Sequence, residues 1–539
     1  MSASWTLSLR EMSEVPEDFR LASPIEQREV LIAGEIRRWN GPLRESLSAV
    51  ELRDDQGVHP VVVGRYPSMG PDDAREALEA AVRAFDRGRG PWPAMSVANR
   101  IRSVEDFLFR MQERRDEIVK LLMWEVGKSL ADSRKEFDRT IQYVRDTIDA
   151  LKELDRVSSR FRIEEGIIGQ IRRSPLGVVL CMGPFNYPLN ETFTTLIPAL
   201  IMGNTVVFKP PRFGVLLYHP LLEAFRDSFP PGVINTVYGD GSTIIGPLMQ
   251  SGKIDVLAFI GSSRVADVLR KEHPHPHRLR AVLGLDAKNA AIVLADADLE
   301  LAVKECVQGT LSFNGQRCTA LKLLFVHQSI LDAFLERFSA EVAKLRIGQP
   351  WDEGVSLTPL PDPKKPAYLR ELVDDALAKG ATVVNAGGGE VHGRVFTPAL
   401  LSPVGTTMRV YHEEQFGPVV PVVPFSDVEE ALEAIVHSSY GQQASVFGRD
   451  PDTVAQLVDV LVNQVCRVNL NAQCQRGPDT FPFTGRKDSA EGTLSVSDAL
   501  RVFSIRTLVA AKEGDASKHL ITEILRGRRS SFLSTDFLL

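Results

Sequence analysis

Several features are scarce or missing in this 539-residue sequence. Cysteine occurs only five times, at widely spaced positions without a CxxC pair, which excludes a disulfide framework and a cysteine-based zinc site. The longest apolar region, residues 178–208, is interrupted by prolines and polar residues and is therefore unable to span a membrane. A net charge of -7 provides no basic surface for nucleic acid. We expect a protein that uses no metal, no membrane and no nucleic acid.

A secretory leader is also missing from the beginning of the sequence. Residues 1–20 contain acidic residues near their end and no continuous apolar segment. Together with the unpaired cysteines, this predicts a cytoplasmic protein. The chain is too long for a single hydrophobic core, so two or three domains are expected.

The hydrophobic patterns that are present predict an α/β fold. Amphipathic helices are expected over residues 72–85, 101–124 and 130–154, followed by a hairpin over residues 161–171. Short apolar strands then alternate with helix-length segments, at residues 178–180, 205–208, 234–237, 256–260 and 282–283. This alternation is typical of a parallel sheet covered by helices, whose ligands bind at the carboxyl ends of the strands.

The loops after these strands contain candidate binding residues. In the first loop, two prolines hold Asn186 and Tyr187, and the Asn186 amide can either donate to an oxyanion or cap the next helix. The second loop carries Lys209 and Arg212, two cations that suit a phosphate, although an exposed charged surface explains them equally. Both loops keep two interpretations open.

A third loop, containing Gly261 and Ser262, connects a strand to a helix. Backbone N–H groups at the start of such a helix are able to bind a pyrophosphate. No GxGxxG pattern supports the nearby Gly-Asp-Gly segment, so that signal is weak. The three loops together indicate a nucleotide site at one edge of the sheet.

Cys318 is the candidate nucleophile. It follows Arg317 in the turn-forming segment Phe313–Thr319, and a neighbouring cation is expected to lower a thiol pKa from about 8.5 toward neutrality. A small buried core cysteine is the alternative. From this residue alone the two interpretations are equally open.

Six motifs, in order and spacing, resemble the aldehyde dehydrogenase superfamily over roughly residues 30–513. They lie at residues 182–190, 209–212, 259–263, 313–319, 413–418 and 482–485. Within that superfamily, residues 186–187, 315–320 and 475–479 are similar to the non-phosphorylating, NADP-dependent glyceraldehyde-3-phosphate dehydrogenases.

The resemblance implies an α/β fold with a Rossmann-type cofactor domain and an α/β catalytic domain. The cofactor domain is expected at residues 31–156 and 177–287, and the catalytic domain at residues 288–487. A β-hairpin arm, residues 157–176 and 488–513, is expected to form a homodimer or homotetramer. This leaves an N-terminal extension, residues 1–30, and a C-terminal tail, residues 514–539, which either docks on a neighbouring subunit or is disordered.

The resemblance also implies a mechanism. Cys318 would attack an aldehyde to give a thiohemiacetal and then a thioester, while the Asn186 amide and the Cys318 N–H stabilise the oxyanion. Expected phosphate ligands are Arg139, Tyr187, Arg317 and Arg476. Expected cofactor ligands are Lys209, Arg212, Gly261, Ser262, Glu414 and Phe416. The implied substrate is a small phosphorylated aldehyde, D-glyceraldehyde 3-phosphate, oxidised to 3-phosphoglycerate.

Arg212 predicts the cofactor. Enzymes of the family that prefer NAD usually carry a glutamate at this position, which would repel a 2′-phosphate, whereas an arginine pairs with it. NADP is therefore the expected cofactor, with NAD as the alternative.

One departure from the family pattern affects the chemistry. The glutamate that acts as general base for thioester hydrolysis is Gly284 here, and losing such a base typically costs about 10²- to 10⁴-fold in its step. Asp286 is the candidate substitute, although it is shorter and about 6.5 to 7 Å further along an extended segment. Two alternatives follow: an acylating enzyme that transfers the thioester to coenzyme A or phosphate, or an impaired paralogue that binds nucleotide or sugar phosphate.

Overall fold

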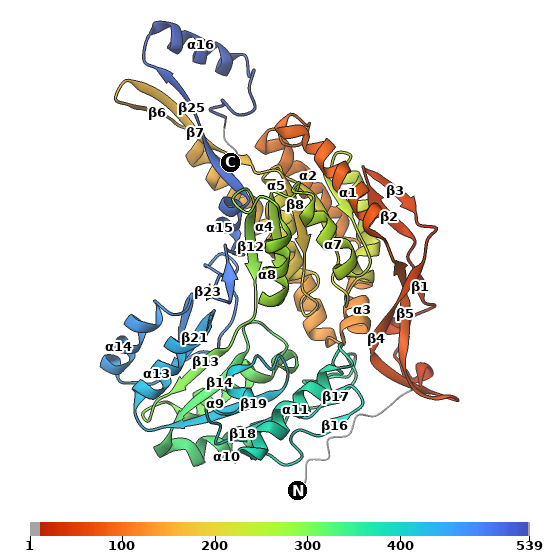
Figure 1. Ribbon diagram of the computed structural model, residues 1–539, viewed down its shortest axis with the longest axis vertical. Helices are drawn as coiled ribbons and strands as arrows, with labels where there is room; N and C mark the ends of the chain where they lie inside the picture. The colour runs from red at the N-terminus through yellow and green to blue at the C-terminus, as the bar shows by residue number, and fades with distance from the viewer. Residues whose placement is uncertain (1–10, 537–539) are drawn as a thin grey trace.

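A computed structural model describes residues 11–536, so residues 1–10 of the expected extension and 537–539 of the expected tail lie outside the described residues. Two large sheets, one in each half of the molecule, and a projecting arm organise the chain (Figure 1). None of the helices in this described part combines the length and apolar composition needed to cross a bilayer.

The first sheet contains all the strands expected between residues 178 and 284. Its strands are β8 (Val178–Met182), β9 (Thr205–Lys209), β10 (Ile234–Thr236), β11 (Val256–Ile260) and β12 (Arg280–Gly284). These five strands are parallel in the order β10-β9-β8-β11-β12, and the short strand β24 (Ala490–Glu491) adds an antiparallel edge. The strands are apolar on both faces because helices cover both faces of the sheet.

The strand order reverses between β8 and β11, which decides where a ligand can bind. Right-handed crossovers place α5 (Asn190–Ile201) and α6 (Leu222–Ser228) on one face and α7 (Gly241–Gln250) and α8 (Ser263–Glu272) on the other. The loops after β8 and β11 therefore leave the sheet on opposite sides of a crevice. These are the loops that carry Asn186 and Gly261.

The helices before the first sheet differ from expectation at one place. They are α1 (Pro71–Phe85), α2 (Val97–Gln112), α3 (Arg115–Val126) and α4 (Leu130–Ser158). The single amphipathic run predicted over residues 101–124 was wrong, because the chain breaks at residues 113–114 and forms two helices. Helix α2 buries one apolar side, whereas α3 is buried all round over residues 121–126, so the apolar residues continue across the break and hide it in the sequence.

The N-terminal segment forms three short strands and one long hairpin, β4–β5, beside the first sheet. They are β1 (Ile25–Glu26), β2 (Glu29–Ile32), β3 (Glu35–Arg38), β4 (Leu43–Asp54) and β5 (Gly57–Pro67). The described part of the expected extension packs on the body of the protein. Val15 is fully buried, and the Trp124 indole N–H donates to the Phe19 carbonyl at 2.7 Å.

The second sheet begins at residue 289. Its strands are β13 (Asn289–Val293), β14 (Leu321–His327), β15 (Thr382–Val383), β18 (Ala399–Ser402), β19 (Val419–Phe425), β21 (Gln443–Phe447) and β22 (Arg467–Leu470), in the order β15-β18-β19-β14-β13-β21-β22. Its helices are α9 (Leu299–Leu311), α10 (Leu331–Val342), α11 (Lys365–Ala378), α12 (Arg409–His412), α13 (Val428–His437) and α14 (Pro451–Leu461). Short pairs complete this half: β16 (Val391–His392) with β17 (Val395–Phe396), and β20 (Tyr440–Gly441) with β23 (Arg486–Lys487).

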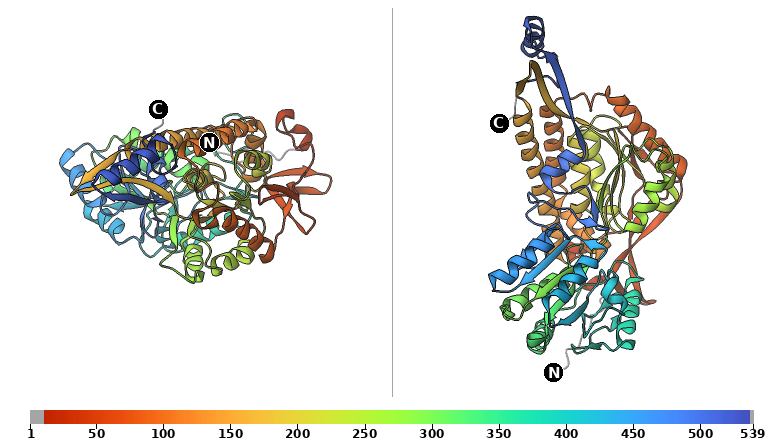
Figure 2. Two further views of the ribbon diagram at one scale, coloured as in Figure 1. Left: turned by 90° about the horizontal axis from the view of Figure 1, so that it is seen from above. Right: turned by 60° about the vertical axis from the view of Figure 1, so that its left-hand side comes forward.

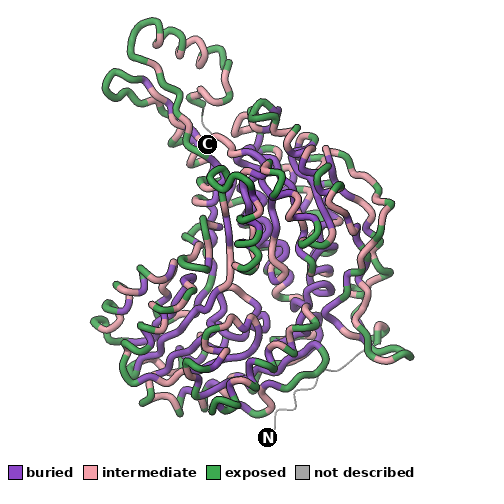
Figure 3. Tube along the Cα trace, viewed as in Figure 1, coloured by how far each residue is buried: buried purple, intermediate pink, exposed green. Residues whose placement is uncertain are grey.

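A three-stranded antiparallel arm projects from the body (Figure 2). It consists of β6 (Phe161–Glu164), β7 (Ile167–Pro175) and β25 (Ser504–Lys512), and helix α15 (Val496–Val502) leads into β25. The chain continues past the arm as helix α16 (Asp515–Arg526) and then folds back, where the Gln170 amide donates to the Ser534 carbonyl at 2.6 Å. The arm and α16 are far more exposed than the body (Figure 3).

Candidate active site

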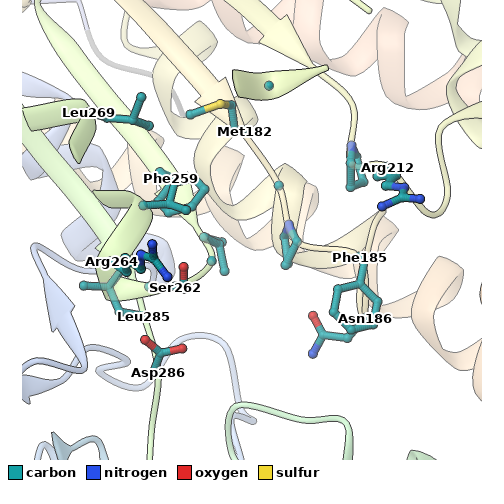
Figure 4. A pocket seen from close by; sticks show the side chains of 18 of the residues that line it. Met182, Phe185, Asn186, Arg212, Phe259, Ser262, Arg264, Leu269, Leu285 and Asp286 are labelled. Atoms are coloured by element: carbon teal, nitrogen blue, oxygen red, sulfur yellow. The ribbon is translucent and has the colours of Figure 1, made fainter. Parts of the chain in front are cut away.

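A cavity of about 1010 Å³ lies at the carboxyl ends of β8, β9 and β11 (Figure 4). Cys318, α11 and residues 413, 414 and 416 of the second half also line it. Its lining contains Cys318, Asn186 and residues from all three predicted loops. The close-up shows Ser262 and Asp286 on one side of the cavity and Asn186 and Arg212 on the other. The strand order therefore brings the predicted nucleophile and the predicted nucleotide loops to one cavity.

Cys318 is positioned by an unusual turn. Phe313, Asn314 and Gly315 all have positive φ, and a Cβ on Gly315 would lie 2.8 Å from the Gly417 carbonyl oxygen, so only glycine fits there. The Asn314 side chain fixes this turn by donating to the Thr358 carbonyl at 3.0 Å and accepting from the Thr358 N–H at 3.1 Å. The turn ends with Cys318 on the cavity wall.

The backbone of Cys318 is held but its N–H is left available. Its carbonyl accepts from the Asn289 amide at 2.7 Å and from Lys322 Nζ at 3.0 Å. The N–H of Cys318 makes no hydrogen bond within residues 11–536. A free backbone donor next to the thiol is what an oxyanion requires.

The expected activation of the thiol by Arg317 was wrong for this arrangement. Burial raises the pKa of Cys318 to about 11, the Glu191 carboxylate adds to the increase, and Lys322 and Arg476 only partly oppose it. The Arg317 guanidinium turns away, toward the Gly309 carbonyl at 2.8 Å at the end of α9. The thiol therefore needs a base to become a thiolate at neutral pH.

Asn186 faces the Cys318 loop. Its Nδ2 donates to the Gln316 carbonyl at 2.9 Å, which leaves a second amide hydrogen available. The alternative that Asn186 caps the following helix was wrong, because α5 has Leu189 at its N-cap position. The geometry supports the oxyanion interpretation.

A buried ion pair that sequence reasoning missed holds the Asn186 loop. Lys128 pairs with Glu136, and both side chains are fully buried. Lys128 also donates to the Asn186 carbonyl at 2.7 Å, while Glu136 accepts from the Leu189 N–H at 3.0 Å. No sequence signal marks this pair. Glu136 lies on α4 and Lys128 in the loop before it, and neither belongs to a recognisable motif.

Two of the predicted phosphate ligands meet at one carboxylate. Arg139 binds both oxygens of Asp479 at 2.8 Å, and Arg476 Nε binds Asp479 at 3.0 Å. Arg476 is buried, and its remaining donors go to Glu191 and to the Leu494 carbonyl. Burial alone would lower the pKa of Arg476, but Glu191 and Asp479 outweigh it and raise that pKa.

The other two predicted phosphate ligands lie nearby. The Tyr187 ring packs 3.6 Å from Lys128 Nζ, and burial raises the pKa of Tyr187 against the opposing charges of Arg317 and Arg139. Arg317 Nε is buried without a partner in the described part of the chain. Tyr187 is therefore near enough to Arg317 and Arg139 for their charges to act on its pKa. Of the three arginines, only Arg139 and Arg476 contact the carboxylates of this region, Asp479 and Glu191.

The predicted adenosine end of the cavity contains two cations. Lys209 ends β9, and burial lowers its pKa to about 8 despite the opposing charge of Asp240. Arg212 is exposed on the cavity edge and forms no salt bridge within the described residues. An unpaired guanidinium here fits a 2′-phosphate.

Asp286 occupies the start of α8. Its Oδ2 accepts from both the N–H and the hydroxyl of Ser263, each at 2.8 Å. This is the helix start at which a pyrophosphate is expected from Gly261 and Ser262. In this arrangement Asp286 acts as a helix cap, and its carboxylate stands beside the anion position.

Two lysines hold the segment of Glu414 and Phe416: Lys322 on β14, and Lys288 directly before β13. Glu414 pairs with Lys322 and accepts from the Ala287 N–H at 3.1 Å. Lys288 holds the same segment by donating to the Glu413 carbonyl at 2.6 Å. Phe416 packs 5.9 Å from Phe185 between ring centroids, so the expected nicotinamide end has a polar and an aromatic wall.

At the position of the missing base the wall is bare backbone. Gly284 lines the cavity, and a Cβ there would approach only Leu494 Cδ1, at 3.2 Å, and Ile260, at 3.5 Å. Glu191 lines the same cavity, and sequence reasoning did not identify it. A first-turn glutamate of a helix is common, so only the fold shows that this one shares the cavity with Cys318 and raises its pKa.

Comparison with known proteins gives one consistent result. Residues 52–508 match the model of the aldehyde dehydrogenase family. The NADP-dependent glyceraldehyde-3-phosphate dehydrogenase of Streptococcus equinus is 34% identical over 459 residues, which are 84% of this chain and 92% of that protein.

Solved structures agree with this match. The enzyme of the same description from Bacillus halodurans, complexed with NADP, has a TM-score of 0.83 and 32% identity, and the match covers 91% of this chain and all of that one. Betaine aldehyde dehydrogenase from Staphylococcus aureus, in complex with NAD+, has a TM-score of 0.82 and 25% identity over 91% of this chain and 96% of that one.

Proposed function

Because this chain belongs to the aldehyde dehydrogenase family, we propose that it oxidises D-glyceraldehyde 3-phosphate to 3-phosphoglycerate with NADP. Cys318 forms a thiohemiacetal and then a thioester with the substrate. The Asn186 amide and the Cys318 N–H donate to the oxyanion. Bound NADP supplies the hydride acceptor.

The observation that carries this proposal is the position of Cys318, which shares a cavity with an amide donor and lies near two cations. The thiol lies on the wall of one cavity with the Asn186 amide, and the cations Arg476 and Lys322 are close enough to act on its pKa. Arg139 and Arg476 are joined through Asp479, so both guanidiniums are held in place. A phosphorylated three-carbon aldehyde offers a carbonyl to the thiol and a phosphate of about -1.5 to -2 charge to such cations.

The cofactor part of the proposal is supported by the nucleotide end of the cavity. Arg212 is unpaired there, and Lys209, Glu414 and the start of α8 line the same space. The S. equinus and B. halodurans relatives carry NADP in their descriptions. Asp286 is the one feature that opposes a pyrophosphate at α8.

Substrate kinetics test the proposed substrate. Arg476→Ala is expected to raise KM sharply for glyceraldehyde 3-phosphate and little for glyceraldehyde, because only the former has the phosphate. Arg317→Ala serves as a second variant, since the guanidinium of Arg317 forms no salt bridge within the described residues and its removal leaves the Arg476 ion pairs intact. Equal effects on both aldehydes in both variants would contradict the assignment.

A homo-oligomer formed through the arm is part of the same proposal. β6, β7, β25 and α16 expose large apolar side chains, namely Ile163, Ile167, Ile505, Leu508, Val509 and Leu520. A second copy would cover this surface (Figure 3). Sedimentation of the full chain against a variant lacking residues 514–539 tests whether the tail adds to the interface.

A second candidate function is acyl transfer to coenzyme A or phosphate. The bare backbone at Gly284 favours it, since such a transfer needs no base for water. One equivalent of NADPH followed by turnover only on addition of coenzyme A or phosphate would identify it. Steady turnover in water alone would exclude it.

A further inference from the structure

Asp286 and Glu191 are two of the carboxylates that line the same cavity as Gly284, and they have different partners. Asp286 is bound by both donors of Ser263. Glu191 has only one oxygen, Oε2, bound, by Arg476, and Oε1 has no hydrogen-bond partner within residues 11–536. Glu191 is 5% exposed and lines the cavity, so its side chain forms part of the cavity wall with little access to bulk solvent.

Glu191 is also the carboxylate with the largest effect on the pKa of Cys318. Of the charges that act on the pKa of the thiol, Glu191 has the largest effect, larger than Lys322 or Arg476. Asp286 is not among the main contributors. The side chain of Glu191 starts in the first turn of α5, directly after the Asn186 loop, so the base and the oxyanion donor come from one rigid segment.

We propose that Glu191 is the general base for thioester hydrolysis in this enzyme. It takes over the role of the family's glutamate, whose position is occupied here by Gly284. This rests on the proposed function, because it concerns the thioester on Cys318. Arg476 orients Glu191 through their ion pair, while Oε1 accepts the hydrogen bond of a water at the carbonyl carbon. Arg476 is a positioning residue in this step.

Water hydrolyses the thioester by addition and then elimination. The water oxygen adds to the thioester carbonyl carbon, and Glu191 takes one water proton. The tetrahedral intermediate collapses with cleavage of the carbon–sulfur bond, so Cys318 leaves as a thiolate. The new carboxylic acid loses its proton to solvent, and Glu191 then releases the proton it accepted.

A cofactor-free ester assay tests this step alone. With p-nitrophenyl acetate, the first equivalent of p-nitrophenolate reports acetylation of Cys318, and later release reports hydrolysis. Glu191→Gln is expected to keep a full first equivalent and to lose about 10²-fold or more of the steady rate. Mass spectrometry should then find the acetyl group on Cys318. Glu300→Gln, an exposed glutamate at the matching position of α9, is the control and should change neither phase.

A rescue variant separates a base from a structural residue. The backbone at Gly284 accepts a Cβ, since the nearest atom is the flexible end of Leu494 at 3.2 Å, so Gly284→Glu introduces a carboxylate on the cavity wall. Glu191→Gln combined with Gly284→Glu should recover at least 10-fold of the steady rate. A merely structural Glu191 would lose both phases together in Glu191→Gln and would not be rescued, and that outcome would overturn the proposal.

Two further outcomes complete the test. Loss of steady hydrolysis in Asp286→Asn, with Glu191→Gln unaffected, would assign the base to Asp286 and overturn the proposal. The ester assay needs neither NADP nor a phosphorylated substrate. If the wild type hydrolyses the ester but releases no NADPH with glyceraldehyde 3-phosphate and NADP, the proposed function fails while the assignment of Glu191 stands.

Discussion

The catalytic side and the nucleotide side of the cavity each hold a carboxylate near a helix start, but the two carboxylates serve different ends. Asp286 is neutralised by the start of α8 and holds that helix. Glu191 is neutralised by Arg476, which is itself held by Asp479. The difference teaches that a buried carboxylate with a fixed cation and one free oxygen is available for proton transfer, whereas a capping carboxylate already has its donors.

The largest expected effect is a loss of stability on the catalytic side of the cavity. Arg476→Ala leaves Glu191 and Asp479 without their shared cation in a buried region, and removing one partner of a buried pair costs about 3–5 kcal/mol. The midpoint of thermal unfolding should therefore fall strongly. On the nucleotide side, Arg270→Ala removes the exposed Arg270–Glu491 pair, at 2.6 Å, and should cost less than about 1 kcal/mol. Similar shifts for both variants would show that the buried network adds no stability.

The next effect concerns the nucleotide side alone. Arg212→Glu replaces the unpaired guanidinium with a repelling charge, and losing a hydrogen bond to a charged group costs roughly 1.5–3 kcal/mol. The ratio of kcat/KM for NADP to that for NAD should fall about 10- to 100-fold. The wild type must prefer NADP for this test to apply. A clear NAD preference in the wild type would contradict the cofactor assignment.

The third prediction concerns how Glu191 and Asp286 each affect the reactivity of the Cys318 thiol. Removing the charge of Glu191 should lower the pKa of the thiol from about 11, since Glu191 raises it. A decrease of one unit would increase the thiolate fraction at pH 8, and hence the rate of iodoacetamide labelling, by about 10-fold. Asp286→Asn should change this rate by less than about twofold. A slower reaction in Glu191→Gln would show that Glu191 acts on the thiol in another way.

The smallest effect is expected at the start of α8. Asp286→Gly removes a negative charge from the position of a pyrophosphate, so NADP should bind tighter, by about 1 kcal/mol or roughly fivefold. The helix loses its cap, which costs about 1 kcal/mol of stability. Calorimetric titration with NADP measures the first change and thermal unfolding the second. Weaker NADP binding would indicate that Asp286 orients the cofactor.

The strands of the first sheet could be predicted because each is a short apolar run bounded by turn residues. Cys318, Asn186 and the three strand-end loops could be proposed for the same local reason. Glu191 could not, since nothing near it in the sequence distinguishes it from any first-turn glutamate. Lys128 and Glu136 were missed because their importance comes from the Asn186 loop, which is some fifty residues away in the chain.

The sequence by itself determined the resemblance to the family, the strands of the first sheet, the thiol at residue 318 and the absence of a glutamate at residue 284. Only the tertiary structure decided the direction in which the pKa of that thiol is shifted, the direction of Arg317, and which carboxylate has the largest effect on that pKa. Local patterns are sufficient for the first group because backbone periodicity and turn chemistry act over a few residues. Charges act through space and through burial, so the second group depends on segments that meet only after the chain has folded.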